Sequence, residues 1–185
     1  MRRNSAIFVL TLLALLVGAG AAQAELGLKA IEARLGYTDL EGEAGGTFIV
    51  SAAADLGRLT PDLGLEFNVD FWNKSWGAEI VDADWTWTNI GFLANLRYMF
   101  KTNSSFHPFI FGGAGLHYWD AGWDCPLCDQ YYLDASTNGV EFGFDVGAGA
   151  EFGKGNMIPV VRAGANWNGG ADYIFVQGGL KFPMD

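Results

Sequence analysis

Residues 141–152 read EFGFDVGAGAEF, and this stretch decides the fold. Apolar side chains occupy every second position, and the positions between them hold only glycine or an acidic residue. The apolar positions are Phe142, Phe144, Val146, Ala148, Ala150 and Phe152. A period of two is typical of a β-strand with one apolar face and one polar face. Because no window after Glu25 shows a sustained apolar repeat of about 3.6 residues, we predict an all-β chain.

Seven further segments complete a set of eight predicted strands. Six of them repeat the alternation, with apolar faces that begin at Ile31, Phe48, Leu63, Ile90, Val161 and Ile174. The seventh, Phe109 to Trp119, is rich in glycine, and its pattern does not assign the two faces. Most strands are about ten residues long, a length that crosses a bilayer at a tilt of about 45°. The predicted fold is an eight-stranded antiparallel up-and-down transmembrane β-barrel, because closure leaves no open strand edge.

The chemistry of the two faces distinguishes a membrane barrel from a soluble one. The apolar face carries no charge in its middle, and the polar face combines glycine with a few charges of both signs, as suits a crowded interior. Aromatic residues gather near the strand ends, where a membrane barrel carries girdles. We assign one girdle to Tyr37, Phe71, Trp72, Trp85, Trp87, Tyr118, Trp119, Trp167 and Tyr173, and the other to Phe100, Phe106, Phe109, Phe152 and Phe182. The less favoured alternative is a soluble periplasmic lipocalin-like carrier, which would turn the apolar face inward.

The first two dozen residues have the order of a secretory signal peptide. Arg2 and Arg3 precede a short apolar run, Ala6–Val17, and small residues then lead to Ala22-Gln23-Ala24. The apolar run is about 12 residues long, and a spanning helix needs roughly 20. We therefore predict a signal peptide over residues 1–24, a barrel domain over residues 25–185, and export to the outer membrane.

Composition excludes several classes of protein. Charged residues make up 17% of the chain and hydrophobic residues 50%, a balance opposite to that of disordered chains. The chain has 11 Lys and Arg against 21 Asp and Glu, for a formal net charge of −10. Phosphate binding requires a basic surface, so we expect no nucleic-acid partner.

The connections between the predicted strands alternate in length. Gly57–Asp62, Lys101–His107 and Lys154–Asn156 are mostly short, as periplasmic turns are in outer-membrane barrels. The others then face the cell exterior, and Asp120–Asn138 is the longest of them. These outer connections are acidic and aromatic, which fits a solvated rim, a site for divalent cations or a basic partner. The candidate contact residues for an unknown surface ligand are Trp76, Trp123, Tyr131 and Tyr132, which also fit a role in the aromatic girdle.

The chain resembles the small eight-stranded outer-membrane proteins of Gram-negative bacteria, the OmpA-barrel, OmpX and OmpW-like group. Four stretches carry the resemblance: Ala22-Gln23-Ala24, Gly143–Gly149, His107-Pro108-Phe109-Ile110 and Gly179-Leu180-Lys181-Phe182. The resemblance covers essentially the whole mature chain. It implies an outer-membrane barrel in contact with lipid and lipopolysaccharide and inserted by the barrel-assembly machinery.

Cys125 and Cys128 lie in the longest outer connection. In an exported protein, two cysteines at this spacing indicate a disulfide that closes a tight loop. A redox-active pair is less favoured, because no helix is predicted whose N-terminus would lower a thiol pKa. Structural zinc is also less favoured, because it needs four ligands.

The polar face supplies a set of charges that we predict to pair inside the barrel. This set is Glu32, Arg34, Glu66, Asp70, Arg97, Glu141, Asp145, Glu151 and Arg162. The interior of an eight-stranded barrel is just wide enough for side chains to fill it, and buried charges must pair. We therefore favour a structural ion-pair network, joined by Gln177 and Lys181, over a catalytic carboxylate pair.

The chain has two histidines. His107 lies in a predicted periplasmic turn, and His117, near the predicted outer rim, has no serine at a spacing that suggests a catalytic partner. We therefore predict a protein that is not an enzyme and needs no cofactor or metal. The leading hypothesis is an envelope structural protein or surface binding and adhesion platform with a plugged polar interior. The alternative is a narrow channel or lateral port for small hydrophobic solutes.

Overall fold

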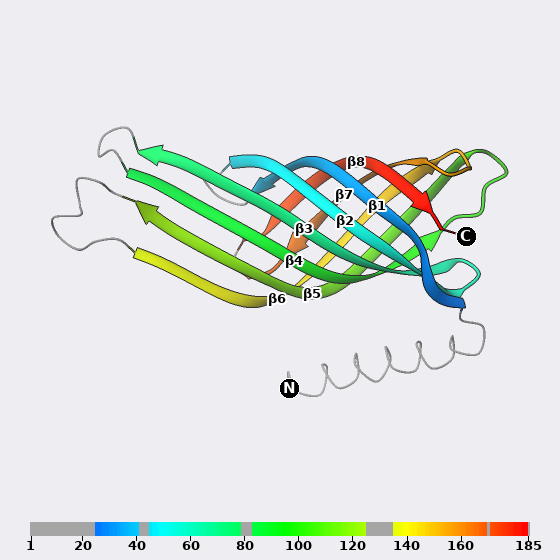
Figure 1. Ribbon diagram of the computed structural model, residues 1–185, viewed down its shortest axis with the longest axis horizontal. Coiled ribbons are helices and arrows are strands. Elements are labelled where there is room, and N and C mark those ends of the chain that lie inside the picture. Colours follow the sequence, from blue (N-terminus) through cyan, green and yellow to red (C-terminus); the bar gives the residue numbers. More distant parts are fainter. Residues whose placement is uncertain (1–24, 41–44, 79–82, 125–134, 170, 185) are drawn as a thin grey trace, which may run out of the picture.

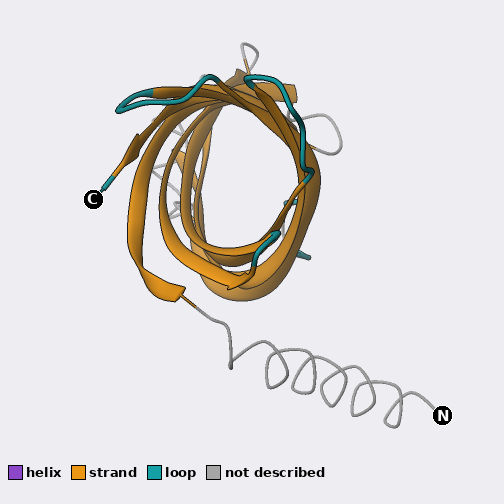
Figure 2. Cartoon of the chain, turned by 90° about the vertical axis from the view of Figure 1, so that its right-hand side faces the viewer, coloured by secondary structure: helices purple, strands orange, loops and turns teal. Residues whose placement is uncertain are grey.

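The computed structural model describes residues 25–40, 45–78, 83–124, 135–169 and 171–184. These residues form eight strands in one closed antiparallel ring, in which each strand pairs with the next and β8 pairs with β1 (Figures 1 and 2). The strands are β1 (Glu25–Leu40), β2 (Gly45–Thr60), β3 (Leu63–Ala78), β4 (Ala83–Met99), β5 (Phe106–Asp124), β6 (Ala135–Phe152), β7 (Ile158–Trp167) and β8 (Tyr173–Pro183). Within these ranges no helix is long and apolar enough to cross a membrane. The predicted eight-stranded up-and-down barrel is confirmed.

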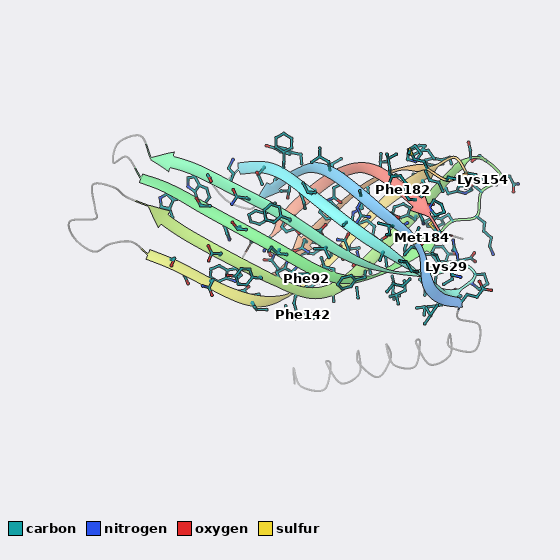
Figure 3. All side chains as sticks on the ribbon, in the orientation of Figure 1. Lys29, Phe92, Phe142, Lys154, Phe182 and Met184 are labelled. Carbon is teal, nitrogen blue, oxygen red and sulfur yellow. The ribbon has the colours of Figure 1, made fainter. Side chains whose placement is uncertain are left out.

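On the strands whose faces the sequence assigns, the polar face points into the barrel and the apolar face points outward. On β1, Glu32 and Arg34 are 1% and 3% exposed, whereas Leu35 on the opposite face is 59% exposed. Phe92 and Phe142 lie on the outward face (Figure 3). An apolar surface this continuous belongs against lipid, because a soluble protein rarely exposes one.

The aromatic girdles are wrong for six residues, whose side chains point inward. Trp72, Phe109 and Tyr173 are each at most 3% exposed, and Trp87 packs against the same interior cluster. Trp85 and Trp119 are inward by strand phase, as register partners of Trp76 and Asn89. The reason is strand phase. Trp72 is two residues after the inward-facing Asp70, so the pleat turns both side chains to the same side. Proximity to a strand end therefore did not decide which way a ring points.

Several strands extend further than the sequence pattern predicts, so the outer connections are shorter. β5 has 19 residues and β6 has 18, which places the bounds of the predicted connection Asp120–Asn138 on paired strands. At the opposite end, β2 and β3 meet in a tight turn at Pro61 and Asp62, where the Leu63 amide donates to Thr60 Oγ1 at 3.2 Å. By the lengths of their connections, the first end is the outer end and the second is periplasmic.

The outward face of β3–β6 changes from apolar to polar along one register row. The last apolar row is Phe71, Ile90, Tyr118 and Val140, which are register partners across the four strands. The next outward row is Asn73, Thr88, Asp120 and Asn138. We interpret this change as the outer boundary of the membrane on this side of the barrel.

Beyond that boundary the four strands continue as a paired sheet. We name residues 73–78, 83–88, 120–124 and 135–138 the projecting sheet. It extends past the outer ends of the other strands (Figure 1). β7 and β8 have only 10 and 11 residues, and the pairing of β6 with β7 begins at Phe144. The projecting sheet is therefore a wall on one side of the mouth rather than a continuation of the ring.

Candidate functional site

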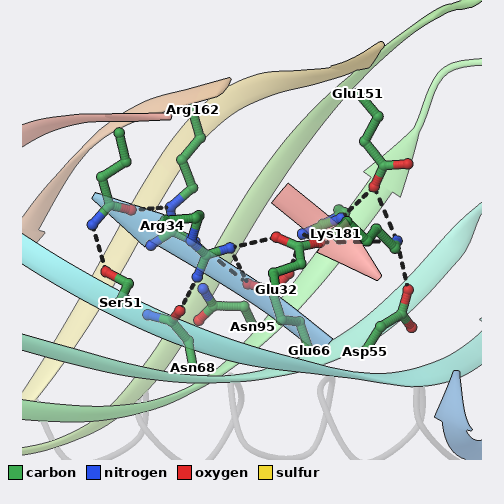
Figure 4. Close-up of polar contacts among 12 residues, drawn as sticks. Glu32, Arg34, Ser51, Asp55, Glu66, Asn68, Asn95, Glu151, Arg162 and Lys181 are labelled. Atoms are coloured by element: carbon green, nitrogen blue, oxygen red, sulfur yellow. Dashed lines mark hydrogen bonds and ion pairs between the residues drawn. The ribbon is translucent and has the colours of Figure 1, made fainter. Parts of the chain in front are cut away.

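The barrel interior contains buried ion pairs centred on Arg97, whose partners Glu32, Glu66 and Glu151 are labelled in Figure 4. Its guanidinium donates to Glu151 Oε1 at 2.6 Å and to Glu32 Oε1 at 2.8 Å, and it also pairs with Glu66. Arg34 donates to the other oxygen of Glu32 at 2.7 Å. One arginine thus holds carboxylates from β1, β3 and β6, which ties distant strands together across the interior.

Lys181 and Arg162 supply the remaining positive charge. Lys181 Nζ lies 2.8 Å from Asp55 Oδ2 and 3.0 Å from Glu151 Oε1. Arg162 Nη1 lies 3.4 Å from Glu66, and its Nε donates to Gln177 Oε1 at 2.8 Å. Lys181 and Gln177 therefore join the network. The sequence analysis did not predict Asp55 as part of this network. Asp55 lies four residues after the inward-facing Ser51 on the same strand, and this even spacing places both side chains on the interior face.

The structure brings most, but not all, of the predicted interior charges into ion pairs. Those that it joins are Glu32, Arg34, Glu66, Asp70, Arg97, Glu151 and Arg162. Asp145 is buried and instead accepts a hydrogen bond from Asn95 Nδ2 at 3.1 Å. Glu141 lies nearer the outer end, opposite His117 in register, and makes no ion pair among the described residues. It does not belong to the predicted network.

Aromatic rings support the interior guanidinium groups. The Arg97 guanidinium carbon lies 4.5 Å from the centre of the Phe109 ring. That of Arg162 lies 4.8 Å from the Phe111 ring and 5.0 Å from the Phe175 ring. The negative face of each ring attracts the cation, so these contacts add to the ion pairs.

An apolar cluster packs beside the ion pairs and continues toward the outer end. Its members are Leu40, Ile49, Trp72, Phe109, Phe111, Val160, Ala171, Tyr173 and Phe175. The Trp72 ring meets the Trp87 ring edge-on at 5.8 Å and the Tyr173 ring at 6.0 Å. The cavity lined by Glu66, Arg97 and Lys181 has a volume of only about 10 Å³, room for one water at most. Side chains therefore fill the interior around the ion pairs.

His117 is enclosed between two glycines and hydrogen-bonded to amides. Its Nδ1 lies 3.1 Å from Asn89 Oδ1 and its Nε2 lies 3.3 Å from Asn166 Nδ2. A Cβ atom at Gly91 or Gly143 would lie 2.7 Å from an imidazole atom, too close for any real contact. These two strands need glycine there because the ring occupies the space of a side chain.

His107 lies near the periplasmic end, with Nδ1 3.4 Å from Thr102 Oγ1. Within the described ranges, no group of three or more His, Cys, Asp or Glu side chains is placed to hold a metal ion.

The candidate outer contact residues fall into two groups. Trp76 and Trp85 lie on the strands of the projecting sheet as direct register partners, with nearly parallel rings whose centres are 6.5 Å apart. The backbone of Trp123 lies on β5 and pairs with Trp85. Tyr131 and Tyr132 lie outside the described residues, as do Cys125 and Cys128, so the disulfide remains a prediction.

The comparison with protein families identifies the barrel. The family model for the outer membrane protein beta-barrel domain matches residues 7–180. The chain belongs to this family. Its location is therefore the outer membrane, and the resemblance to the small eight-stranded barrels of Gram-negative bacteria is confirmed. The signal peptide at residues 1–24 remains a prediction and lies outside the described residues.

Solved outer-membrane barrels share the fold at low sequence identity. Neisserial surface protein A is 16% identical, with 84% of this chain and 96% of that chain covered and a TM-score of 0.59. The attachment invasion locus protein of Yersinia pestis, in complex with the heparin analogue sucrose octasulfate, is 11% identical, with 85% and 100% covered and a TM-score of 0.58. A major outer membrane protein of Thermus thermophilus is also 11% identical, with 85% of this chain and 100% of that chain covered and a TM-score of 0.58. No curated protein matches the chain.

Proposed function

We propose that this outer-membrane barrel is a non-enzymatic protein that presents a binding surface outside the cell on its projecting sheet. The observation that carries the proposal is that β3–β6 stay paired beyond the polar boundary row. These strands have 16 to 19 residues, although about 9 to 11 are enough to cross a bilayer. The extra residues form a hydrogen-bonded wall beyond the apolar band, which suits a rigid surface for contact with a partner.

The filled interior argues against the alternative of a narrow channel or lateral port. Arg97 and its carboxylate partners block the periplasmic half, and Trp72 and Tyr173 block the outer half. A solute would have to displace buried ion pairs, each of which costs several kcal/mol to break.

The histidines argue against catalysis. A His acting as general base needs a nucleophile within hydrogen-bond reach. His117 is fully buried and contacts the amides of Asn89 and Asn166. His107 lies 3.4 Å from the Thr102 hydroxyl, but that hydroxyl donates to the Phe106 carbonyl oxygen rather than to the imidazole. Neither residue has an arrangement that activates a hydroxyl or a water for attack.

The charge of the outer end constrains the chemistry of a partner. Residues 37–47, 73–88, 118–142 and 166–174 contain 12 acidic residues and one basic residue, Lys74. The Yersinia pestis barrel was crystallised with a sulfated heparin analogue, but an acidic surface repels such a polyanion. We also infer that lipid and lipopolysaccharide surround the outward apolar face and that the barrel-assembly machinery inserts it.

The test compares bacteria that express the full chain with bacteria that express a variant lacking the projecting sheet. In the variant, short turns replace residues 74–87 and 121–137. A heat-modifiability gel on the outer-membrane fraction checks that both barrels fold. Attachment is then measured on beads coated with amines, carboxylates, phenyl groups or neutral glycans.

We expect bacteria that express the full chain to attach more strongly to at least one surface than cells without the protein. Bacteria that express the variant should attach no more strongly than cells without the protein. Attachment no higher than that of cells without the protein, on every surface, would overturn the proposal. A steady conductance of the purified barrel in planar bilayers would favour the channel instead.

A further inference from the structure

The inner face of the outer end is rich in tryptophan. The strand phase that turns Asp70 and His117 inward also places Trp72, Trp76, Trp85, Trp87 and Trp119 on this face, five of the seven tryptophans in the chain. By contrast, Trp167 lies on the outward face, stacked on Phe144 at 5.3 Å. We name Trp76, Trp85 and Trp87 the tryptophan face.

In the projecting sheet the two faces have exchanged their chemistry. The outward side carries small polar residues, where Asn73 Nδ2 donates to Thr88 Oγ1 at 2.8 Å and the hydroxyls of Ser75 and Thr86 lie 3.4 Å apart. The inward side carries the indoles. Trp76 and Trp85 are 36% and 43% exposed, which is a large apolar exposure on the side of the sheet that faces away from the lipid.

The tryptophan face is anchored to the barrel interior. Trp87 packs edge-on against Trp72, which is fully buried in the apolar cluster, and Trp76 and Trp85 stack on each other further out on the same face. Paired strands hold these indoles in place, so a ligand would not have to order them. A surface organised in advance loses less entropy on binding.

The sequence of the outer segments favours a cationic ligand. The outer segments hold 12 acidic residues, and the one basic residue, Lys74, donates its Nζ to the Gly46 carbonyl oxygen at 2.8 Å. Tryptophan is the aromatic side chain that attracts a cation most strongly, and a planar guanidinium also stacks on it. Inside the same barrel, Arg97 and Arg162 already lie over phenylalanine rings.

We propose that the tryptophan face docks a basic polypeptide segment, with Arg or Lys side chains stacked on Trp76 and Trp85 and drawn in by the acidic outer end. This inference rests on the proposed binding function and names the chemistry of the partner. Tryptophan supplies the contact energy, and the net negative charge raises the association rate.

The test uses the full-length protein, refolded in lipid nanodiscs, and titrates it with an oligo-arginine peptide. Matched titrations use an oligo-glutamate peptide and a neutral oligosaccharide. The variant Trp76→Ala/Trp85→Ala removes the exposed indoles, and Trp167→Ala removes one indole from the lipid side as a control. We expect the double variant to weaken oligo-arginine binding about tenfold or more and the control to leave it unchanged. Affinity should fall as salt rises.

Three results would overturn this inference. Equal affinity of the wild type and the double variant would mean that acidic charge alone attracts the peptide. Binding of the neutral oligosaccharide in place of oligo-arginine would make the surface a glycan site. Binding that appears only after residues 125–134 are replaced by a short linker would make that segment the occupant. If oligo-arginine fails while the sheet-deletion variant still loses attachment, the binding function stands and only the partner is wrong.

Discussion

Arg97 on β4 reaches across the barrel interior to Glu151 on β6, with 2.6 Å between Nη1 and Oε1. The same guanidinium pairs with Glu32 and Glu66, so three buried carboxylates share one cation as a common partner. This arrangement makes Arg97 the most costly of the interior charges to remove.

Arg97→Met should therefore lower the free energy of unfolding by about 3–5 kcal/mol, because it leaves uncompensated charge in a dry interior. Urea unfolding of the barrel in liposomes measures this change. Arg58→Ala is the control, because this exposed arginine donates only to the Pro61 carbonyl and should shift stability by about 0.5 kcal/mol or less. Equal effects of the two substitutions would show that the ion pairs do not stabilise the fold.

Gly91→Ala should destabilise the barrel by about 1–3 kcal/mol, because its Cβ would overlap the His117 ring. The double variant Gly91→Ala/His117→Ala should recover part of that loss relative to His117→Ala alone. Gly178→Ala is the matched control, because its Cβ would meet nothing within 4 Å. If the free-energy changes of the two single substitutions simply add in the double variant, the His117 ring is not the reason that position 91 requires glycine.

Ala94→Arg tests the membrane boundary from the lipid side. Ala94 lies on the outward face of β4 within the apolar band, where an arginine costs about 2–4 kcal/mol near the bilayer midplane. Thr86→Arg lies beyond the boundary row on the same face of the same strand and should be nearly neutral. Unfolding in liposomes compares the two variants, and a neutral Ala94→Arg would contradict the assigned lipid face.

The mature protein should begin at Glu25, the residue at which β1 also begins. Intact-mass spectrometry of protein from the outer-membrane fraction measures the cleavage site. A mature chain that retains residues 1–24 would contradict the predicted signal peptide.

Cys125 and Cys128 should resist alkylation until a reductant is added. Because the loop they close is short, reduction should change the stability of the barrel little. Mass spectrometry of alkylated peptides, with and without reductant, measures the pairing. Full labelling of unreduced protein would show free thiols.

Strand phase made much of this interior predictable. Because side chains alternate strictly along a strand, placing Glu32 and Arg34 on the face opposite Leu35 needed only the sequence. Glu66 and Arg97 followed from the same argument on their own strands. Their pairing could also be predicted, because the interior of a narrow barrel brings opposite buried charges within contact distance.

The pattern of a single strand does not predict which side chains of the glycine-rich strand β5 point inward. Phe109 and Phe111 point inward because the facing strand leaves room for their rings. A Cβ on Gly149 or Gly147 would overlap Phe109 or Phe111 respectively. This complementarity between neighbouring strands is invisible in either strand alone.

The outer end was the least predictable part for a similar reason. Trp76 and Trp85 alternate with polar neighbours at a period of two. Beyond the boundary row, however, the apolar side chains face inward and the polar side chains face outward. Because apolar residues of a membrane barrel are expected to face lipid, the sequence pattern assigns Trp76 to an outer connection and Trp85 to an aromatic girdle. Only the register between neighbouring strands, from β3 to β6, shows that the strands continue.

The one-sided wall gives the barrel a front and a back. A plain barrel looks the same from every direction along the cell surface, but here the projecting sheet stands on the β3–β6 side of the mouth, and β7 and β8 are much shorter. A molecule anchored in the same membrane therefore meets a different surface on each side of the barrel. The rotation of the barrel about the membrane normal, and whatever neighbour fixes that rotation, would then decide which approaches are open.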